Sequence, residues 1–129
     1  LRECDIISLH LSSNEDTDHF MDADKIAQMK SGSVLINTSR GALVDSDALI
    51  DALESGHLAG AGLDVVDGDR NIYYSDHKNQ MLHHHQMAIL NSMPNVLLLP
   101  HMAYYTDQAL EDMVRNSLAV TSEYFLTHQ

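Results

Sequence analysis

Side chains that could bind anions and transfer protons follow three apolar runs of this sequence. Arg40 follows LINTS, the carboxylates Asp64, Asp67 and Asp69 follow AGAGL, and His101 follows NVLLLP. A guanidinium group stays charged and pairs with planar anions, and histidine exchanges protons near neutral pH. We therefore predict that these side chains line an active site, on the condition that the three runs end at the same edge of the fold.

The elements that must position these residues alternate between strand-like and helix-like runs. The strand-like runs are β-rich or nearly all apolar and cover 4–11, 33–38, 59–65 and 95–100. Capping residues precede apolar positions at helical spacing in three places. The predicted helices are one capped by Asp22 and ending near Met29, one capped by Asp45 or Ser46 and stopped by Gly56, and one beginning at Thr106 or Asp107.

This alternation favours an α/β fold, in which helices cover a parallel sheet through right-handed crossovers. Ligands of such sheets bind at the carboxyl ends of the strands. The segments of Arg40, Asp64 and His101 all fall at such ends. The pattern thus predicts that the sheet brings the three groups together.

Composition excludes several classes of protein. The chain has 129 residues, which fits one domain, and 19 acidic against 7 basic residues give a net charge of −12 that would repel nucleic acid. Cys4 is the single cysteine, so an internal disulfide is impossible and a reducing compartment is the simpler assignment. Apolar runs are too short for a membrane span and no signal peptide is apparent. We expect a cytoplasmic protein without nucleic-acid or membrane partners.

The motifs SRGALVD, GLDVVDGD and PHMAYYT occur in this order on alternating strand-like runs. Their spacing resembles that of the NAD-dependent D-2-hydroxyacid dehydrogenases, and the paired tyrosines are most similar to the D-lactate dehydrogenase and vancomycin-resistance dehydrogenase branch. The resemblance implies a partial Rossmann-type, doubly wound parallel sheet. Residues 1–105 would be the second half of the NAD-binding domain, and residues 106–129 a crossover helix returning towards a substrate domain.

The resemblance also implies hydride transfer between NAD and the C2 carbon of a 2-keto acid. Arg40 would bind the substrate carboxylate and polarise the keto oxygen, and His101 would be the general acid in reduction and the base in oxidation. A carboxylate beside that histidine would hold its tautomer and favour the imidazolium form. The family has a glutamate in this role, whereas this sequence has Asp69, which is one methylene shorter.

The resemblance assigns further residues to the cofactor and the substrate. Leu11 and Ser12 stand where a Val-Pro pair usually lines the adenine pocket, and Tyr104 would line the substrate pocket. The full cofactor-binding set implied is Leu11, Ser12, Thr17, Thr38, Ser39, Arg40 and Asp64.

Each of these residues also has a simpler structural interpretation. Arg40 could lie in a solvated turn, His101 could be satisfied by backbone groups at a strand end, and Asp64 could be a capping or loop carboxylate, as Asp67 is expected to be. Tyr104 could equally serve packing. The motif pattern favours the catalytic interpretation for Arg40, Asp69 and His101.

Two features suggest other sites but are interpreted as structural. His83, His84 and His85, with His77 nearby, point in different directions on a helix, so we expect a solvated helix and no metal site. Gly60-Ala61-Gly62 looks like the start of a dinucleotide fingerprint, but Val65 replaces its third glycine and the glycines precede their strand.

The sequence therefore predicts an oxidoreductase that reduces a small, pyruvate-like 2-keto acid to the D-2-hydroxy acid with NADH. The alternative is a non-catalytic NAD-sensing or interaction module on the same fold. No phosphate-binding glycine-rich turn is found in these residues, so we expect a piece of a longer enzyme that is inactive alone. An uncovered sheet edge would pair with another copy, and a homodimer is expected.

Overall fold

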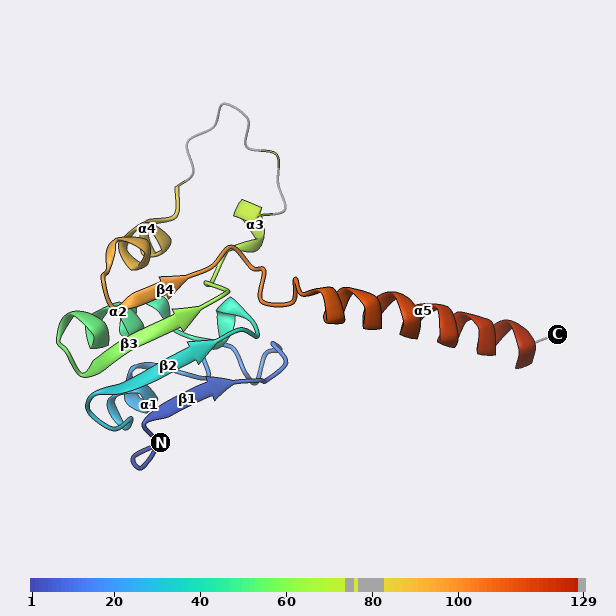
Figure 1. The fold of residues 1–129 in the computed structure, drawn as a ribbon. Helices are drawn as coiled ribbons and strands as arrows, with labels where there is room; N and C mark the ends of the chain where they lie inside the picture. The colour runs from blue at the N-terminus through green and yellow to red at the C-terminus, as the bar shows by residue number, and fades with distance from the viewer. Residues whose placement is uncertain (74–75, 77–82, 128–129) are drawn as a thin grey trace.

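Four parallel strands form one sheet in a computed structural model that describes residues 1–73, 76 and 83–127 (Figure 1). The strands are β1 (Ile6–Leu9), β2 (Ser33–Asn37), β3 (Leu58–Leu63) and β4 (Val96–Leu98), and they lie in this order. Leu9 pairs with Asn37, Asn37 with Leu63, and Leu63 with Leu98. The carboxyl ends of all four strands are therefore level, which meets the condition on which the predicted site depends.

Helices α1 (Ala23–Ala27), α2 (Ser46–Glu54) and α4 (His85–Ser92) form a row, because α2 packs against both α1 and α4. Right-handed crossovers between strands in sequential order place such helices on one face of a sheet. α2 also packs on β3, and α4 on β4. The predicted α/β fold with a parallel sheet is confirmed.

The two predicted N-caps on this face are present. The carboxylate of Asp22 accepts a hydrogen bond from Lys25 N at 2.8 Å at the start of α1. Asp45, and not Ser46, caps α2 by accepting from Asp47 N and Ala48 N. The apolar faces of these helices bury the core with the strands, and its most deeply buried members include Met21, Ile26, Leu35, Leu43, Leu49, Leu58 and Leu90.

The glycines of GAG lie within β3 rather than in a phosphate-binding turn. A Cβ at Gly60 would lie 2.7 Å from the backbone oxygen of Asn95, and one at Gly62 would lie 2.9 Å from Ile36 Cδ1. Gly60 needs glycine because the backbone just before β4 approaches it closely, whereas at Gly62 the near atom is the end of the Ile36 side chain, which can shift. The expectation that these glycines precede their strand is wrong, because β3 contains them; the interpretation as structural glycines stands, because they lie in a strand and not in a turn that could bind phosphate.

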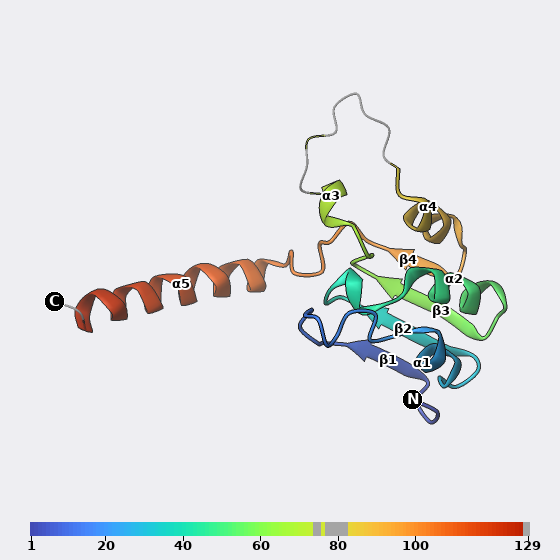
Figure 2. The same ribbon diagram turned by 180° about the vertical axis from the view of Figure 1, so that it is seen from behind.

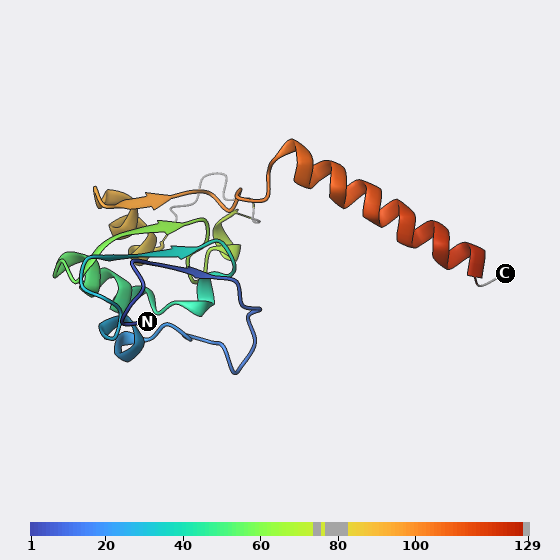
Figure 3. The same ribbon diagram turned by 60° about the horizontal axis from the view of Figure 1, so that its bottom comes forward.

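Helix α5 (Asp107–Thr127) extends away from the sheet in all three views (Figures 1, 2 and 3). The Thr106 hydroxyl accepts from Ala109 N at 3.2 Å, as expected for a helix that begins at this point. None of its 21 residues is buried. Among the described residues, no helix is long and apolar enough to cross a membrane.

The histidine-rich segment differs from the prediction. Helix α4 begins at His85, and His84 is its N-cap residue and half-buried, so a solvated helix through all three histidines is wrong. His77 lies outside the described residues. Within the described part of the chain, no group of three His, Cys, Asp or Glu side chains could hold a metal ion. The short elements η1 (Gly41–Leu43) and α3 (Arg70–Tyr73) were not predicted.

Candidate active site

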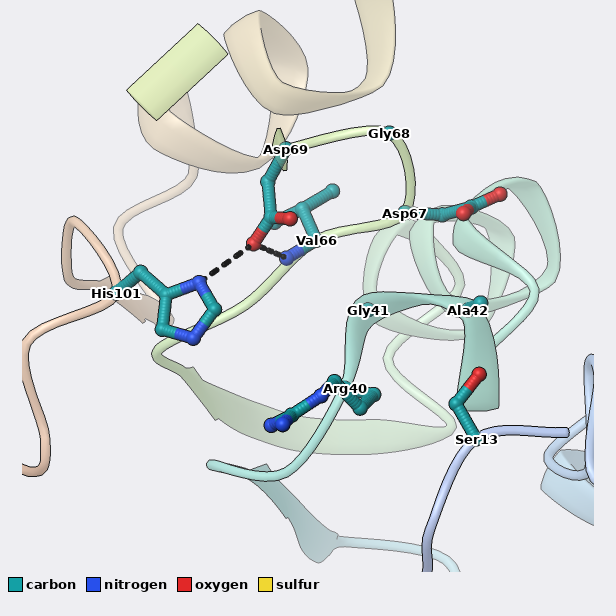
Figure 4. Close-up of a pocket in the computed structure, with 9 residues that line it drawn as sticks. All are labelled: Ser13, Arg40, Gly41, Ala42, Val66, Asp67, Gly68, Asp69 and His101. Atoms are coloured by element: carbon teal, nitrogen blue, oxygen red, sulfur yellow. Dashed lines mark hydrogen bonds and ion pairs between the residues drawn. The ribbon is translucent and has the colours of Figure 1, made fainter. Parts of the chain in front are cut away.

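A cavity of about 410 Å³ opens at the carboxyl ends of the strands (Figure 4). The loops after β2, β3 and β4 supply its walls, and Arg40, Asp69 and His101 all face it. The predicted catalytic residues are thus brought together. The other lining residues are Ser13, Gly41, Ala42, Val66, Asp67 and Gly68.

Arg40 is exposed and stands at the end of a turn that the side chain of Asn37 shapes. Asn37 is the last residue of β2 and is buried; its side chain donates to Arg40 O at 2.9 Å and accepts from Ser39 N at 3.1 Å. The guanidinium of Arg40 donates only to the neighbouring Ser39 O among the hydrogen bonds found in the described residues. Most of its five donors are therefore available to an anionic ligand.

Gly41 brings the Arg40 turn into contact with the loop that follows β3. A Cβ at Gly41 would lie 2.1 Å from the backbone carbon and oxygen of Val66 and 2.5 Å from Asp67 N. Real Cβ atoms do not approach backbone so closely, so only glycine permits this packing. The Arg-Gly pair therefore places the cation and the carboxylate loop against one another.

His101 and Asp69 form an ion pair with 3.5 Å between Nδ1 and Oδ2 (Figure 4). Both side chains are largely withdrawn from water, at 18% and 7% exposure. The same Asp69 oxygen accepts from Val66 N at 3.3 Å. Nδ1 is the ring nitrogen that faces Asp69, and Nε2 lies on the other side of the ring.

Asp64 holds the backbone that carries His101. Its carboxylate accepts from Met102 N at 2.7 Å and Ala103 N at 2.8 Å, and its backbone oxygen accepts from His101 N at 2.9 Å. His101 has a φ of 55°, a left-handed conformation that costs a non-glycine residue about 1–2 kcal/mol. Asp64 is 3% exposed, so these hydrogen bonds form away from water and offset that cost.

Residues 1–103 match the family described as "D-isomer specific 2-hydroxyacid dehydrogenase, NAD binding domain". The chain belongs to this family. A "D-specific alpha-keto acid dehydrogenase" of Enterococcus faecium is 44% identical over 118 residues, which are 92% of this chain and 37% of the relative. An "Aromatic 2-oxoacid reductase" of Clostridium sporogenes is 40% identical over 97% of this chain and 38% of its own length.

A solved D-lactate dehydrogenase from Sporolactobacillus sp. superimposes with a TM-score of 0.84 and 41% identity, over 92% of this chain and 36% of that protein. The chain thus spans under two fifths of the length of each of these three proteins. The predicted D-2-hydroxyacid dehydrogenase family, its Rossmann-type fold and NAD as the cofactor of its domain are confirmed.

The predicted cofactor-binding residues lie at the strand ends, and hydrogen bonds join several of them. Ser39 Oγ donates to Leu11 O at 2.6 Å, which ties the end of β2 to the segment after β1. Thr17 Oγ1 donates to Ser12 O at 2.7 Å and closes the following loop. Thr38 is exposed. These hydrogen bonds join the end of β2 to the segment that follows β1, and the binding of a dinucleotide along these residues stays a prediction.

Two tyrosines lie near the site in different settings. Tyr104 is 50% exposed, stacks edge-to-face on Tyr105 and is not among the residues that line the cavity, so its substrate contact stays a prediction. Tyr73, at the end of α3, has a raised pKa because burial disfavours the phenolate and because Asp69 and Asp64 repel its negative charge. The raised pKa keeps Tyr73 neutral through the range where histidine titrates.

The sequence analysis did not predict the hydrogen bonds by which Asn37 shapes the Arg40 turn, or those from Met102 N and Ala103 N to the carboxylate of Asp64. Asn37 had one signal, since it is a polar residue at the end of an otherwise apolar strand. Asp64 was assigned to the cofactor and also recognised as a loop carboxylate; its link to residues 102 and 103 spans 38 and 39 positions, which no local pattern reveals. Asp67 is a partly exposed loop carboxylate, 3.5 Å from His19 Nε2.

Proposed function

We propose that the protein containing this chain reduces 2-keto acids to D-2-hydroxy acids with NADH. The observation that carries this proposal is the convergence of Arg40 and the His101–Asp69 pair on one cavity at the carboxyl edge of the sheet. An anion-binding cation and a proton donor that line one cavity suit a substrate with adjacent carboxylate and keto groups.

The bound dinucleotide would supply the hydride, and this chain's residues would bind, orient and protonate the substrate. Arg40 pairs with the carboxylate and polarises the keto oxygen. His101 donates the proton from Nε2 to that oxygen and takes it back in the reverse direction. Asp69 acts on Nδ1, where it holds the orientation of the ring.

Leu11, Ser12, Thr17, Thr38, Ser39, Arg40 and Asp64 are the residues we propose along the dinucleotide. The hydrogen bonds from Ser39 to Leu11 and from Thr17 to Ser12 support this placement, because they preorganise the edge on which the cofactor would lie. For Asp64 the support is weaker, since both carboxylate oxygens already accept backbone hydrogen bonds.

Small 2-keto acids of the pyruvate type are the substrates we propose. The residues Gly41, Ala42 and Gly68 leave a cavity of about 410 Å³ without bulky walls of their own. Tyr104 is proposed to line the substrate side. Because one relative is named for aromatic 2-oxoacids, phenylpyruvate is the decisive competitor to pyruvate.

We propose that residues 1–105 form the second half of a dinucleotide-binding domain and that residues 106–129 return towards a substrate domain. The exposed apolar side chains of α5 support this arrangement, because a helix of this kind is stable only against a partner. A cytoplasmic homodimer is proposed for the whole protein, and no turnover is expected from the 129-residue chain alone. The non-catalytic alternative is not favoured, because Arg40, His101 and Asp69 converge.

The test is NADH oxidation by the whole protein with pyruvate, 2-ketobutyrate, hydroxypyruvate and phenylpyruvate in turn. We expect turnover with the first three, and Arg40→Lys should raise the KM for the keto acid about 100-fold, because a bidentate charged pair is lost. Arg2→Lys, at an exposed arginine ahead of β1 and outside the cavity lining, is the matched control. If the protein binds NADH but oxidises it with none of the four keto acids, the proposal is overturned.

The role of Asp69 has its own test. Asp69→Asn keeps the size of the side chain but removes the negative charge opposite Nδ1 of His101, so kcat for keto-acid reduction should fall about tenfold. Asp67→Asn in the same loop is the control, because Asp67 lies away from His101. An unchanged kcat for Asp69→Asn would refute the assignment.

A further inference from the structure

His84 connects helix α4 to residues 66–69, the loop that carries Asp69. Its Nδ1 accepts from Met87 N at 3.1 Å as the N-cap of α4, and its Nε2 lies 2.6 Å from Asp67 O. The flanking His83 and His85 are exposed, whereas His84 is half-buried. His84 is therefore distinguished from its neighbours by packing as well as by contacts.

The two contacts specify the protonation state of His84. Met87 N–H can only donate, so Nδ1 must be an unprotonated acceptor, and Asp67 O can only accept, so Nε2 must carry the proton. Neutral imidazole with the proton on Nε2 is the one form that makes both hydrogen bonds. Imidazolium would lose the bond to Met87 N.

The loop at residues 66–69 is held between two surfaces. On one side Val66 and Asp67 pack on Gly41. On the other side, His84 approaches so closely that a Cβ at Gly68 would lie 3.3 Å from its Nε2, where the backbone also has a φ of +78°. Since Asp69 is the next residue and its carboxylate reaches His101 at 3.5 Å, a small shift of the loop changes that distance directly.

We propose that His84 is a positioning residue: in its neutral form with the proton on Nε2, it holds residues 66–69 so that Asp69 stays against His101. This role rests on the proposed dehydrogenase function, because its kinetic consequence is the orientation of the proton donor. His84 itself lies outside the set of residues lining the cavity and acts only through the loop.

Two substitutions in the whole protein separate the two contacts. Asn places its amide where Nδ1 lies, so His84→Asn keeps an N-cap but cannot reach Asp67 O. Gln places its amide where Nε2 lies, so His84→Gln keeps the donor to Asp67 O and loses the cap. We expect His84→Asn to lower kcat for keto-acid reduction about tenfold, the effect of one lost positioning hydrogen bond, with KM for the keto acid unchanged.

His84→Gln should instead retain kcat and lower Tm, because glutamine is a poor N-cap. His83→Gln and His85→Gln are the matched controls and should change neither quantity. Hydrogen exchange supplies a readout that does not depend on turnover: in His84→Asn, the amides of Val66 and Asp69 should exchange faster, while those of β2 and β3 stay protected.

Three results would overturn the role of His84. The first is a kcat of His84→Asn equal to that of the unsubstituted protein. The second is an equal loss of kcat in the Asn and Gln variants that follows their loss of Tm, and the third is unchanged hydrogen exchange at residues 66–69. If the unsubstituted protein reduces no keto acid, the proposed function fails, and the exchange experiment still decides whether His84 holds the loop.

Discussion

The loops at the carboxyl ends of the strands are held by buried side chains, whereas helix α5 buries none of its own. Buried side chains of Asn37 and Asp64 bond to the backbone of the loops that carry Arg40 and His101, so the site is held by contacts within residues 1–105. In α5 no residue is buried, and Leu118 and Phe125 are each 64% exposed. The geometry of the proposed catalytic groups is thus set within the sheet region, whereas α5 buries no side chain among the described residues.

The largest expected effect comes from breaking the closest contact in the supported region. Gly41→Ala would place a Cβ 2.1 Å from the backbone of Val66, so the Arg40 turn and the loop with Asp69 must separate. We expect a loss of about 3 kcal/mol in unfolding free energy. A displacement of about 1 Å should also lower kcat/KM about 100-fold. Urea unfolding and steady-state kinetics of the whole protein measure both.

Gly32→Ala is the control for Gly41→Ala. Gly32 has a φ of +81° and open space around it, at the opposite end of the sheet from the site. Alanine there should cost about 1–2 kcal/mol of stability through backbone strain and leave kcat/KM unchanged. Equal kinetic losses in both variants would mean that activity simply follows stability.

A smaller effect is expected from Asp64→Asn, which tests whether this residue supports His101 or the cofactor. The amide has one oxygen and cannot accept from both Met102 N and Ala103 N, so one part-buried donor loses its partner, at about 1 kcal/mol. Poorer placement of His101 should lower kcat about 30-fold, with KM for NADH unchanged. A raised KM for NADH at normal kcat would assign Asp64 to the cofactor instead. Asp67→Asn, with its carboxylate half exposed, is the control.

The contrast between the two regions also shows which features of the fold and of the site could be predicted from the sequence. Helix caps and apolar runs are local signals, so the cap at Asp22, a cap at Asp45 or Ser46, and the four strands in their order were predicted correctly. Motif spacing identified Arg40, Asp69 and His101. The supporting contacts of Asp64 and His84 join residues 17 to 39 positions apart in the sequence, and they depend on backbone turns that no short pattern encodes.

The start of α5 and the apolar positions along it were predictable from the sequence. That none of these positions is buried was visible only in the structure. Its start near Thr106 follows from the cap and from apolar spacing. Exposure of nearly every apolar side chain on it is a property of the arrangement in space. A sequence pattern specifies which face of a helix is apolar, but not whether the chain supplies the surface that covers it.

The smallest expected effect lies in α5 itself. In the 129-residue chain, Leu118→Gln should change the unfolding free energy by less than about 0.5 kcal/mol, because Leu118 is 64% exposed. In the whole protein the same change should cost about 2 kcal/mol, since α5 would be packed against a substrate domain. Leu90→Ala, at a core position 1% exposed, should cost about 3 kcal/mol in both and is the control. A loss for Leu118→Gln that is equally small in the whole protein would show that α5 has no apolar partner there, and the proposed return towards a substrate domain would have to be abandoned.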